Sequence, residues 1–367
     1  MKRILILTNS DVGLYKFRKE LIENFIRQGY EVVISLPYGD FIKELQEMGC
    51  VFYQTNFERR GMNPICDLKL CCTYFKLLKK FTPSIVLTYT IKPNIYGGIV
   101  CRIKKIPYIV NITGLGTAIE NQGIISKVLL KLYKASLKKS QCVFFQNARN
   151  KNYFETKRIF FGNSKLIPGS GVNLQEFCFE TYPSEREKTK FLFIGRIMKD
   201  KGIEEFLCCA EEIFKENKNV EFGIIGDYDD KKYEEVISGL ENRGIVTYYG
   251  MQQDVRPFIK DSNAIILPSY HEGLSNVLLE AAAMGRPVIA SDIFGCKETF
   301  CENITGIGFK VKDSKALLNA VRKFLNLSWK EQAIMGSKAR KKIEAEFDRN
   351  IIINAYNNEI NRKEVEK

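Results

Sequence analysis

The chain has 367 residues, of which 45% are hydrophobic, and because one hydrophobic core rarely organises that length we expect two domains. No run of about 18 uncharged apolar residues occurs, which argues against a membrane-spanning helix, and the apolar start is too short for a signal peptide, so we expect a cytoplasmic protein. The 11 cysteines include no Cys-x-x-Cys pair, which indicates reduced thiols rather than a zinc site or a disulfide framework.

One half of the chain carries the whole net charge of +13. Residues 1–180 contain 27 Lys and Arg against 13 Asp and Glu, whereas residues 181–367 contain 29 against 30. A basic surface on one domain favours an anionic partner, which could be nucleic acid, an acidic membrane face or a phosphorylated substrate.

The first half of the chain alternates segments of strand and helix character. We expect strands at residues 3–8, 31–36, 51–55, 84–88, 108–111 and 141–145, and helices at 14–28, 41–48, 68–81, 94–104 and 124–139. Repeated βα units with apolar strands predict a parallel sheet that helices cover on both faces.

The alternation breaks at residues 166–173, and a polar run at 182–190 predicts the interdomain linker. It then restarts, with strands expected at 190–195, 220–225, 245–249, 264–267, 287–290 and 306–311, and helices at 203–216, 231–240, 255–261, 277–284, 313–325 and 329–346. We therefore predict an α/β protein with Rossmann-like domains at residues 1–180 and 181–347, and a C-terminal helix at 348–367 that could return to the first domain. Sheets of this kind bind ligands beyond the carboxyl ends of their strands.

The most informative motif is a loop that leads into a helix, Ser269-Tyr-His-Glu-Gly-Leu-Ser-Asn-Val-Leu-Leu-Glu280. The backbone amides of residues 274–276 would form the helix N-terminus, where free N–H groups and the helix dipole favour a phosphate. Beside them, the Glu272 carboxylate could hold sugar hydroxyls. Taken alone, Glu272 and Glu280 are more often a loop charge and a solvated helix residue.

A second motif, Phe193-Ile-Gly-Arg-Ile-Met-Lys-Asp-Lys-Gly202, places Arg196 at the carboxyl end of a strand and Lys201 just before a helix. Gly195 would let the backbone approach a ligand, and the two cations could neutralise a diphosphate. Two solvated surface charges would give the same pattern, but the glutamates further along the same domain favour ligand binding.

Several other motifs are incomplete or missing. Gly114-Leu-Gly116 and Gly169-Ser-Gly171 lack the third glycine of a dinucleotide fingerprint, and no Gly-Lys-Ser/Thr occurs. His271, the only histidine, has no nucleophile elbow beside it, and we expect it to orient or pack rather than to bind a metal. Gly13 lies in the first predicted βα turn, where it marks a tight turn or a close approach to a ligand.

Two predicted helices of the basic half carry lysine stripes. The helix at 124–139 has one polar and one apolar side, formed by Lys127, Lys131, Lys134 and Lys138, and by Ile125, Val128, Leu129, Leu132 and Tyr133. The helix at 68–81 repeats the pattern with Lys69, Lys76 and Lys80. Packing of the apolar sides on the sheet explains either helix alone, whereas two such helices in one basic domain favour contact with anionic lipid headgroups.

Together these motifs resemble the retaining, metal-independent GT-B glycosyltransferases of family 4, and the resemblance spans nearly the whole chain. It rests on Gly195-Arg196…Lys201-Gly202 and on Glu272-Gly-Leu-Ser-Asn-Val-Leu-Leu-Glu280-Ala. Tyr89-Thr-Ile-Lys-Pro-Asn94 and Asn111-Ile-Thr-Gly-Leu-Gly116 are similar to the branch that extends polyprenyl-diphosphate-linked sugars for capsule, O-antigen or protein glycosylation. The resemblance implies two Rossmann-like domains that face each other across a cleft.

The resemblance also implies roles for individual residues. Arg196 and Lys201 would hold the donor diphosphate, Glu272 the donor sugar and Glu280 the ribose. The other donor-side positions that it implies are Gly13, Gly195, Gly226, Gly250-Met251, Gly273, Leu274, Ser275 and Asn276, and the acceptor-side positions are Lys92, Asn94 and Thr113. Many members carry a histidine where this chain has Ile91, so the role of that histidine does not transfer.

The implied reaction moves an N-acetylhexosamine or hexose from a UDP-sugar, as co-substrate, to a polyprenyl-diphosphate-linked saccharide with retention of anomeric configuration. It takes place at the inner face of the cell membrane, and we expect neither a cofactor nor a metal ion. Two alternatives stay open at this point. A nucleotide-sugar 2-epimerase of the same architecture would need no acceptor, and a non-catalytic nucleic-acid-binding protein would use the basic half, although the sequence holds no such recognition motif.

Overall fold

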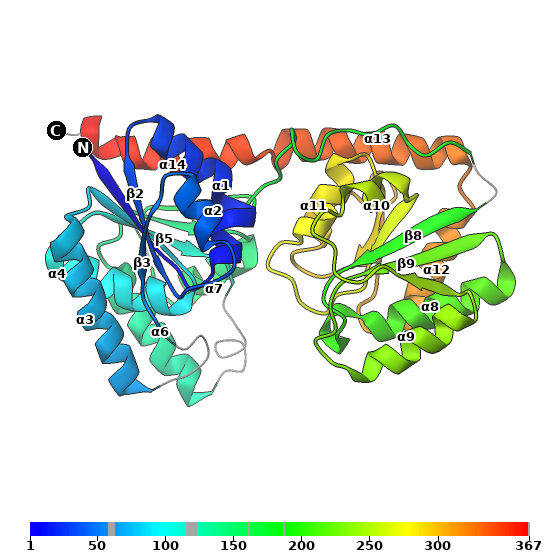
Figure 1. Cartoon of the computed structure of the whole chain (residues 1–367), viewed down its shortest axis with the longest axis horizontal. Coiled ribbons are helices and arrows are strands. Elements are labelled where there is room, and N and C mark those ends of the chain that lie inside the picture. The colour runs from blue at the N-terminus through cyan, green and yellow to red at the C-terminus, as the bar shows by residue number, and fades with distance from the viewer. Residues whose placement is uncertain (58–62, 115–122, 161, 186–187, 366–367) are drawn as a thin grey trace. The chain divides into compact units, whose positions relative to one another are not determined.

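The structure is a computed structural model that describes residues 1–57, 63–114, 123–160, 162–185 and 188–365. The chain forms two compact units, each built around its own parallel sheet (Figure 1). The N-terminal unit comprises Met1–Ser170 and Asn350–Lys367, and the C-terminal unit comprises Gly171–Arg349. The predicted α/β class with two Rossmann-like sheets is confirmed, although the first unit ends before residue 180.

The N-terminal sheet has seven parallel strands in the order β3-β2-β1-β4-β5-β6-β7. Their bounds are β1 (Arg3–Leu7), β2 (Glu31–Leu36), β3 (Val51–Gln54), β4 (Ile85–Tyr89), β5 (Tyr108–Ile112), β6 (Cys142–Phe145) and β7 (Ser164–Leu166). Central strands such as β1 are apolar after their first residue, here Arg3, because both sheet faces are covered. The strand order reverses between β1 and β4, and ligands bind at such a point.

Helices cover both faces of this sheet. One face packs against α1 (Asp11–Arg27), α2 (Ile42–Glu47) and α14 (Arg349–Val365). The other packs against α3 (Pro64–Phe81), the π-helix η1 (Pro93–Gly97), α4 (Gly98–Lys104), α6 (Ile124–Leu137) and α7 (Ala148–Thr156). Helix α3 begins four residues before its predicted start because Asn63 caps it and accepts hydrogen bonds from the Ile65 and Cys66 amides.

Helix α14 follows the C-terminal unit in sequence but contributes to the core of the N-terminal unit. The Tyr89 hydroxyl at the end of β4 donates to the Tyr356 hydroxyl on α14 at 2.9 Å, and the Tyr356 hydroxyl donates to the Asn111 side-chain oxygen on β5. All three side chains are at least nine-tenths buried. Burial raises the pKa of Tyr356 well above its usual value, so this hydroxyl stays protonated and can donate.

The C-terminal sheet has six parallel strands in the order β10-β9-β8-β11-β12-β13. Their bounds are β8 (Thr189–Ile194), β9 (Val220–Ile225), β10 (Val246–Tyr248), β11 (Ala264–Leu267), β12 (Val288–Ser291) and β13 (Gly306–Phe309). Strand β8 lies between β9 and β11, so the order reverses at β8, next to β11.

One face of the C-terminal sheet packs against α8 (Ile203–Glu216), α9 (Lys232–Asn242) and α12 (Ser314–Leu325). The other packs against α10 (Arg256–Asp261) and α11 (Asn276–Ala283). Helix α13 (Trp329–Glu346) packs against α11 in a smaller apolar cluster. These apolar clusters on the two faces of the sheet form the core of this unit.

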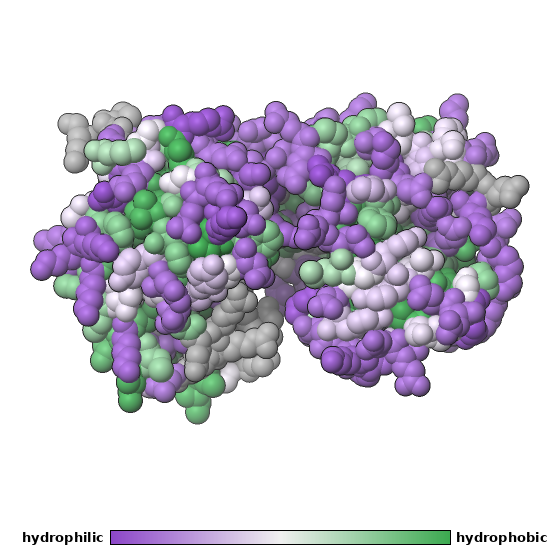
Figure 2. Space-filling model, viewed as in Figure 1, coloured by the Kyte–Doolittle hydropathy of each residue, from purple (hydrophilic) through white to green (hydrophobic). Residues whose placement is uncertain are grey.

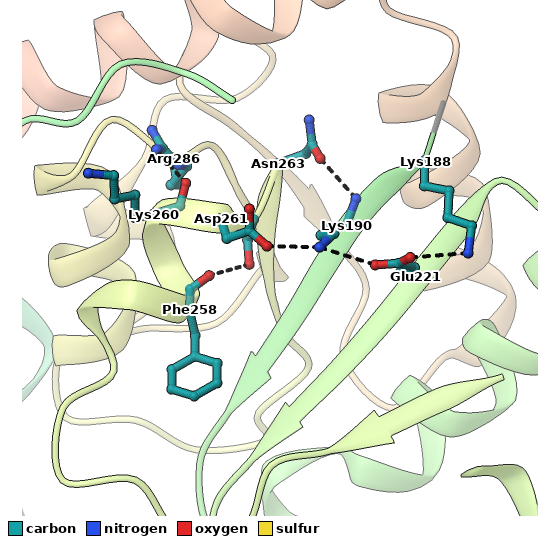
Figure 3. A network of polar contacts seen from close by, with 9 residues as sticks. Lys188, Lys190, Glu221, Phe258, Lys260, Asp261, Asn263 and Arg286 are labelled. Carbon is teal, nitrogen blue, oxygen red and sulfur yellow. Dashed lines mark hydrogen bonds and ion pairs between the residues drawn. The ribbon is translucent and has the colours of Figure 1, made fainter. Parts of the chain in front are cut away.

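The segment predicted as a linker is bound to the C-terminal unit. The Tyr182 hydroxyl donates to the carbonyl of Asn263, and the indole of Trp329 donates to the carbonyl of Pro183. At the start of β8, Lys190 Nζ lies 2.8 Å from Asp261 Oδ2 and 3.4 Å from Glu221 Oε2 (Figure 3). The polar run was predicted as the interdomain linker, and in the structure its Tyr182 and Lys190 side chains pair with the C-terminal sheet and α10.

A buried arginine binds the residues just before this segment and the C-terminal ends of α10 and α11. Arg286 is fully buried and its guanidinium donates only to backbone carbonyls, including that of Lys260 at the end of α10 (Figure 3). The other acceptors are the carbonyls of Ile259, Glu180, Thr181, Met284 and Gly285. Burial lowers the pKa of Arg286 to about 10, and the guanidinium still stays charged at neutral pH.

Candidate functional site

The sequence-predicted donor residues converge at the carboxyl edge of the C-terminal sheet. Arg196 follows β8, Gly226 follows β9 and Glu272 lies in the loop after β11, and these three strands are neighbours. Lys201 ends a short 3-10 turn, η2 (Lys199–Lys201), between β8 and α8. The site thus lies where the strand order reverses, which is the expected ligand position for this sheet type.

Lys201 and Glu272 form the central ion pair of this site. Lys201 Nζ lies 2.6 Å from Glu272 Oε1, and the two side chains are 22% and 14% exposed. The hydroxyl of Ser269, which is fully buried, donates to the same Oε1 at 2.8 Å. Among the described residues, Glu272 Oε2 has no hydrogen-bond partner, so the carboxylate is held by one oxygen and can accept from a ligand with the other.

Two glycines fix the backbone around this pair. Gly226 has φ +151°, and a Cβ there would lie 1.8 Å from the carbonyl oxygen of Gly195. Gly202 has φ +73°, and a Cβ there would lie 2.1 Å from the carbonyl oxygen of Pro268. Only glycine permits these approaches, which bring the β8 turn against the ends of β9 and β11.

Helix α11 begins beside Glu272, as predicted. Ser275 is its N-cap, and its hydroxyl accepts from the Leu278 amide at 3.4 Å. The Ser275 amide donates its hydrogen to the Gly295 carbonyl at 2.8 Å. In this structure that amide is therefore not available for the phosphate contact expected of it. Gly273, Leu274 and Asn276 are half-buried at the same helix start, and Glu280 is half-buried within the helix.

Arg196 is more exposed than the central pair. Its Nη1 lies 3.2 Å from Asp229 Oδ1, with side chains 60% and 45% exposed. Because an exposed pair contributes little free energy, the guanidinium can exchange this partner for an anionic ligand. Asp229 forms with Asp227 an Asp-x-Asp pair directly after β9. The expectation that no such acidic pair ends a strand, on which the prediction of metal independence rests, is therefore wrong.

The ends of β9 and β10 form the remaining donor-side surface. The Gly226 amide donates to the Gly250 carbonyl at 3.0 Å, and Met251 after it is 74% exposed. Tyr248 stacks obliquely on Tyr228, with ring centroids 5.0 Å apart, and its hydroxyl donates to the Gly226 carbonyl. This tyrosine pair, which no sequence motif indicated, lies beside Gly226, one of the predicted donor-side positions.

Cys296 lies near the Lys201–Glu272 pair, and no sequence motif indicated it. Burial, followed by the nearby Glu272 carboxylate, raises the pKa of its thiol well above the usual value. The thiol therefore stays neutral and is a packing group rather than a nucleophile.

The predicted acceptor-side residues occupy different environments in the N-terminal unit. Lys92 Nζ lies 2.9 Å from Asp67 Oδ1, and both side chains are largely buried. The Asn94 side chain is buried and hydrogen-bonded inside the unit: its oxygen accepts from Thr88 and its nitrogen donates to the Asn111 carbonyl. Asn94 therefore shapes the backbone instead of facing a ligand. Thr113 is half-buried just after β5, while Gly116 lies outside the described residues.

Gly13 does not occupy the predicted turn. It lies in the first turn of α1, where its amide donates to the hydroxyl of the N-cap, Ser10, at 3.1 Å. The serine cap starts the helix three residues earlier than the apolar pattern predicted. Over the part of the chain that the structure describes, no helix is long and apolar enough to span a bilayer.

Two families match the chain. The family described as Glycosyl transferase 4-like matches residues 3–147, and the family described as Glycosyl transferases group 1 matches residues 174–342. Each match covers most of one sheet and its helices. The second contains both the Arg196…Lys201 and the Glu272…Glu280 segments.

The chain is also similar to individual proteins of this kind. It is 27% identical over 371 residues to the N,N'-diacetylbacillosaminyl-diphospho-undecaprenol α-1,3-N-acetylgalactosaminyltransferase of Campylobacter jejuni, covering 96% of this chain and 97% of that protein. It is 27% identical over 280 residues to the UDP-Gal:α-D-GlcNAc-diphosphoundecaprenol α-1,3-galactosyltransferase of Escherichia coli, covering 71% of each.

Among solved structures, a glycosyltransferase from Rickettsia africae superimposes with a TM-score of 0.84 at 20% identity, covering 98% of both chains. This likeness concerns the fold. Since the two family matches and the two Rossmann-like sheets agree, the chain belongs to the glycosyltransferases of GT-B fold, with a 4-like N-terminal and a group 1 C-terminal domain.

Proposed function

We propose that the protein transfers an N-acetylhexosamine or hexose from a UDP-sugar to a polyprenyl-diphosphate-linked saccharide, with retention of anomeric configuration, in surface-glycan biosynthesis. The names of the Campylobacter and Escherichia coli relatives support the acceptor class, since both describe transfer to a sugar on diphospho-undecaprenol. The second name also supports a UDP-sugar donor. The reaction would take place at the inner face of the cell membrane.

The Lys201–Glu272 pair carries this proposal. A cation and a carboxylate 2.6 Å apart, both largely buried at the point of strand reversal, form a site with both charges that a nucleotide sugar needs. The ammonium suits a phosphate oxygen, and the carboxylate accepts from sugar hydroxyls. An ion pair that only stabilised the fold could lie anywhere on the protein surface. This pair joins the η2 turn to the loop after β11, at the carboxyl edge of the sheet where such folds bind ligands.

The residues of the C-terminal unit can do most of the chemistry by stabilising the leaving group. Arg196 and Lys201 would neutralise the departing diphosphate while the bond between the anomeric carbon and the phosphate oxygen breaks. The acceptor hydroxyl forms the new bond on the same face and gives its proton to the leaving phosphate oxygen, so no separate base is required. Glu272 would hold the sugar and Glu280 the ribose, with Gly226 and Met251 beside the base.

The N-terminal unit supplies the acceptor side in this proposal. It contains 30 Lys and Arg against 14 Asp and Glu, whereas the C-terminal unit contains 26 against 29. That excess favours the diphosphate of the acceptor and an anionic membrane surface. Lys92 and Thr113, at the carboxyl ends of β4 and β5, are the proposed acceptor contacts.

The test is turnover of a panel of nucleotide sugars with a polyprenyl-diphosphate saccharide, with the product linkage read by NMR. We expect transfer from a UDP-sugar with retention. Lys201→Ala and Glu272→Ala should each lower kcat/KM by about 10²-fold or more, because each removes a charged contact in a partly desolvated site.

Lys199→Ala is the matched control, because Lys199 lies in the same turn but is 63% exposed and paired only loosely with Glu204. It should retain nearly full activity. Near wild-type turnover by either site variant would refute the assignment of the site. Conversion of the donor sugar to its epimer in the absence of acceptor would refute the transferase proposal in favour of an epimerase.

A further inference from the structure

Two buried tyrosines donate hydrogen bonds to adjacent glutamates in the first turn of α8. The Tyr233 hydroxyl on α9 donates to Glu204 Oε1, and the Tyr270 hydroxyl donates to Glu205 Oε1, both at 2.7 Å. Tyr233 and Tyr270 are 4 and 7% exposed. The two contacts are alike in chemistry and in length, but only Tyr270 lies in the loop that carries Glu272.

The two glutamates differ in their surroundings. Figure 2 shows mostly hydrophilic side chains along the lower side of the C-terminal unit, where α8 and α9 lie in Figure 1. The Glu204 side chain is 43% exposed and lies 3.8 Å from Lys199 Nζ and 4.0 Å from Lys232 Nζ. Glu205, in contrast, is 7% exposed. Its Oε2 atom is buried and, over the part of the chain that the structure describes, has no hydrogen-bond partner.

A carboxylate in the position of Glu205 is unfavourable for stability unless its environment compensates. Burying a charged group with one oxygen unsatisfied costs free energy, and the Tyr270 hydroxyl satisfies only the other oxygen. The N-terminus of α8, whose free N–H groups favour a negative charge, offsets part of that cost. Because an apolar side chain of similar length would fill the same space without this cost, stability alone does not explain Glu205.

Tyr270 is held by three contacts. Its amide donates to the Asp200 carbonyl at 2.9 Å, its hydroxyl donates to Glu205, and Lys312 Nζ lies 4.8 Å from the centroid of its ring. Burial, followed by the hydrogen bond to Glu205, raises the pKa of Tyr270 above its usual value, so the hydroxyl stays protonated and can donate. Tyr270 therefore joins the loop after β11 to the η2 turn and to α8.

The same loop carries the Glu272 carboxylate two residues further on. Lys201 Nζ lies 2.6 Å from Glu272 Oε1, so side chains of this loop meet the segment of η2 and α8 at two points, the ion pair and the Tyr270 hydroxyl. Among the described residues, loss of the Tyr270 contact would leave the ion pair as the only side-chain hydrogen bond across this junction. The direction of Glu272 Oε2 therefore depends on Tyr270 as well as on Lys201.

We propose that Glu205 is a positioning residue, which acts through Tyr270 to direct the Glu272 carboxylate toward the donor sugar. The inference rests on the proposed function for the identity of that donor. Glu205 holds the tyrosine ring, the ring fixes the backbone of the loop, and the backbone sets the direction of Glu272 Oε2. Glu205 itself touches no substrate. Because misplacement of a contact by about 1 Å can lower a rate by about 10²-fold, its loss acts on sugar transfer.

Variants at both ends of the hydrogen bond test this role. Glu205→Met, which has a similar volume but no acceptor, and Tyr270→Phe, which has no donor, should each lower kcat/KM for the UDP-sugar by about tenfold or more. Glu205→Gln keeps an oxygen that can accept from Tyr270 and should restore most of the activity. The double variant Glu205→Met, Tyr270→Phe should lose no more than the more affected single variant, because residues that act through one contact are not additive.

Binding of UDP separates a positioning role from a structural one. UDP lacks the sugar, so its affinity should change by less than about twofold in all four variants. The matched control is Tyr233→Phe, which deletes the other 2.7 Å bond between a buried tyrosine and a glutamate of α8 and should retain nearly full kcat/KM. Equal losses of kcat/KM in Tyr233→Phe and Tyr270→Phe, a parallel loss of UDP affinity in Glu205→Met, or full activity of Glu205→Met would each overturn the proposal.

Hydrogen–deuterium exchange of the backbone provides a readout that needs no turnover. In Glu205→Met the amides of residues 269–273, among them that of Tyr270, should exchange about tenfold faster than in the wild type, whereas those of α9 should not change. Faster exchange in a protein that transfers no sugar would refute the proposed function and leave the positioning role standing. Unchanged exchange in a protein that does transfer sugar would refute the positioning role alone.

Discussion

Ser269 is the residue whose role in the candidate site depends most on tertiary structure. Its hydroxyl and the Lys201 ammonium both donate to Glu272 Oε1, so the serine fixes the carboxylate in the orientation that leaves Oε2 for a ligand. It does not reach the reacting atoms, and its effect is exerted through Glu272. Ser269 is therefore a positioning residue.

We predict that Ser269→Ala lowers kcat/KM by roughly 10- to 100-fold, because a hydrogen bond to a charged group contributes about 1.5–3 kcal/mol. Ser269→Thr, which keeps the hydroxyl, should restore most of the activity. The control is Ser262→Ala, which removes a buried hydroxyl bonded to the Phe258 carbonyl away from the site. If both alanine variants lost stability alike and Ser269→Ala kept its kcat/KM, the serine would be structural only.

The charged residues of the candidate site could be predicted from the sequence, but the groups that hold them could not. Arg196, Lys201 and Glu272 could be predicted because their residue types and positions after strands carry the information. Ser269 and Asp229 could not, since their partners lie on other strands and only the folded structure identifies them. Asn94 is the opposite case: its motif predicts an acceptor contact, whereas in the structure its buried side chain accepts from Thr88 and donates to the Asn111 carbonyl.

Among the helices, α14 shows how a distant segment completes a core. Its Tyr356 hydroxyl joins Tyr89 on β4 and Asn111 on β5 inside the N-terminal unit. Without this contact the Tyr89 hydroxyl and the Asn111 side chain would each lose a partner in a buried environment.

We predict that Tyr356→Phe destabilises the N-terminal unit by about 1–3 kcal/mol, the cost of leaving buried polar groups unsatisfied. Thermal unfolding followed by calorimetry would measure it. Tyr38→Phe, at a position that is 69% exposed, should change stability by less than about 0.5 kcal/mol. An unchanged melting temperature for Tyr356→Phe would contradict the assignment of α14 to this core.

The strands were largely predictable because buried parallel strands are short, apolar and flanked by turns. The structure adds β7 and α7, which the sequence did not indicate: β7 has only three residues and no buried side chain, and α7 has few apolar residues. Exposure was harder to predict than helix formation. The apolar pattern of α6 is typical of a packed helix, whereas Ile124, Ile125 and Val128 in its first two turns are exposed.

At the scale of the whole molecule, the pair Asp227 and Asp229 after β9 bears on metal dependence. Two carboxylates at this spacing could share a divalent cation with a diphosphate. Asp229 is paired with Arg196, and the Asp227 carboxylate accepts from the Tyr228 amide. We predict that Arg196 and Lys201 neutralise the diphosphate without a metal ion, so that EDTA leaves turnover unchanged. Activity lost in EDTA and restored by Mg²⁺ or Mn²⁺ would show that a metal ion held by the two aspartates, rather than Arg196, binds the diphosphate.

The return of α14 to the first sheet has a consequence for synthesis on the ribosome. The N-terminal unit is interrupted in sequence by Gly171–Arg349, so its core is incomplete until α14 has been translated. At about 5–20 residues per second this interval lasts roughly 10–40 s, during which the face that receives Tyr356 and Ile352 is uncovered. That interval is the time in which the C-terminal unit, continuous in sequence, is itself synthesised up to Arg349. Vectorial synthesis therefore leaves the closing of the first core to the last step of translation.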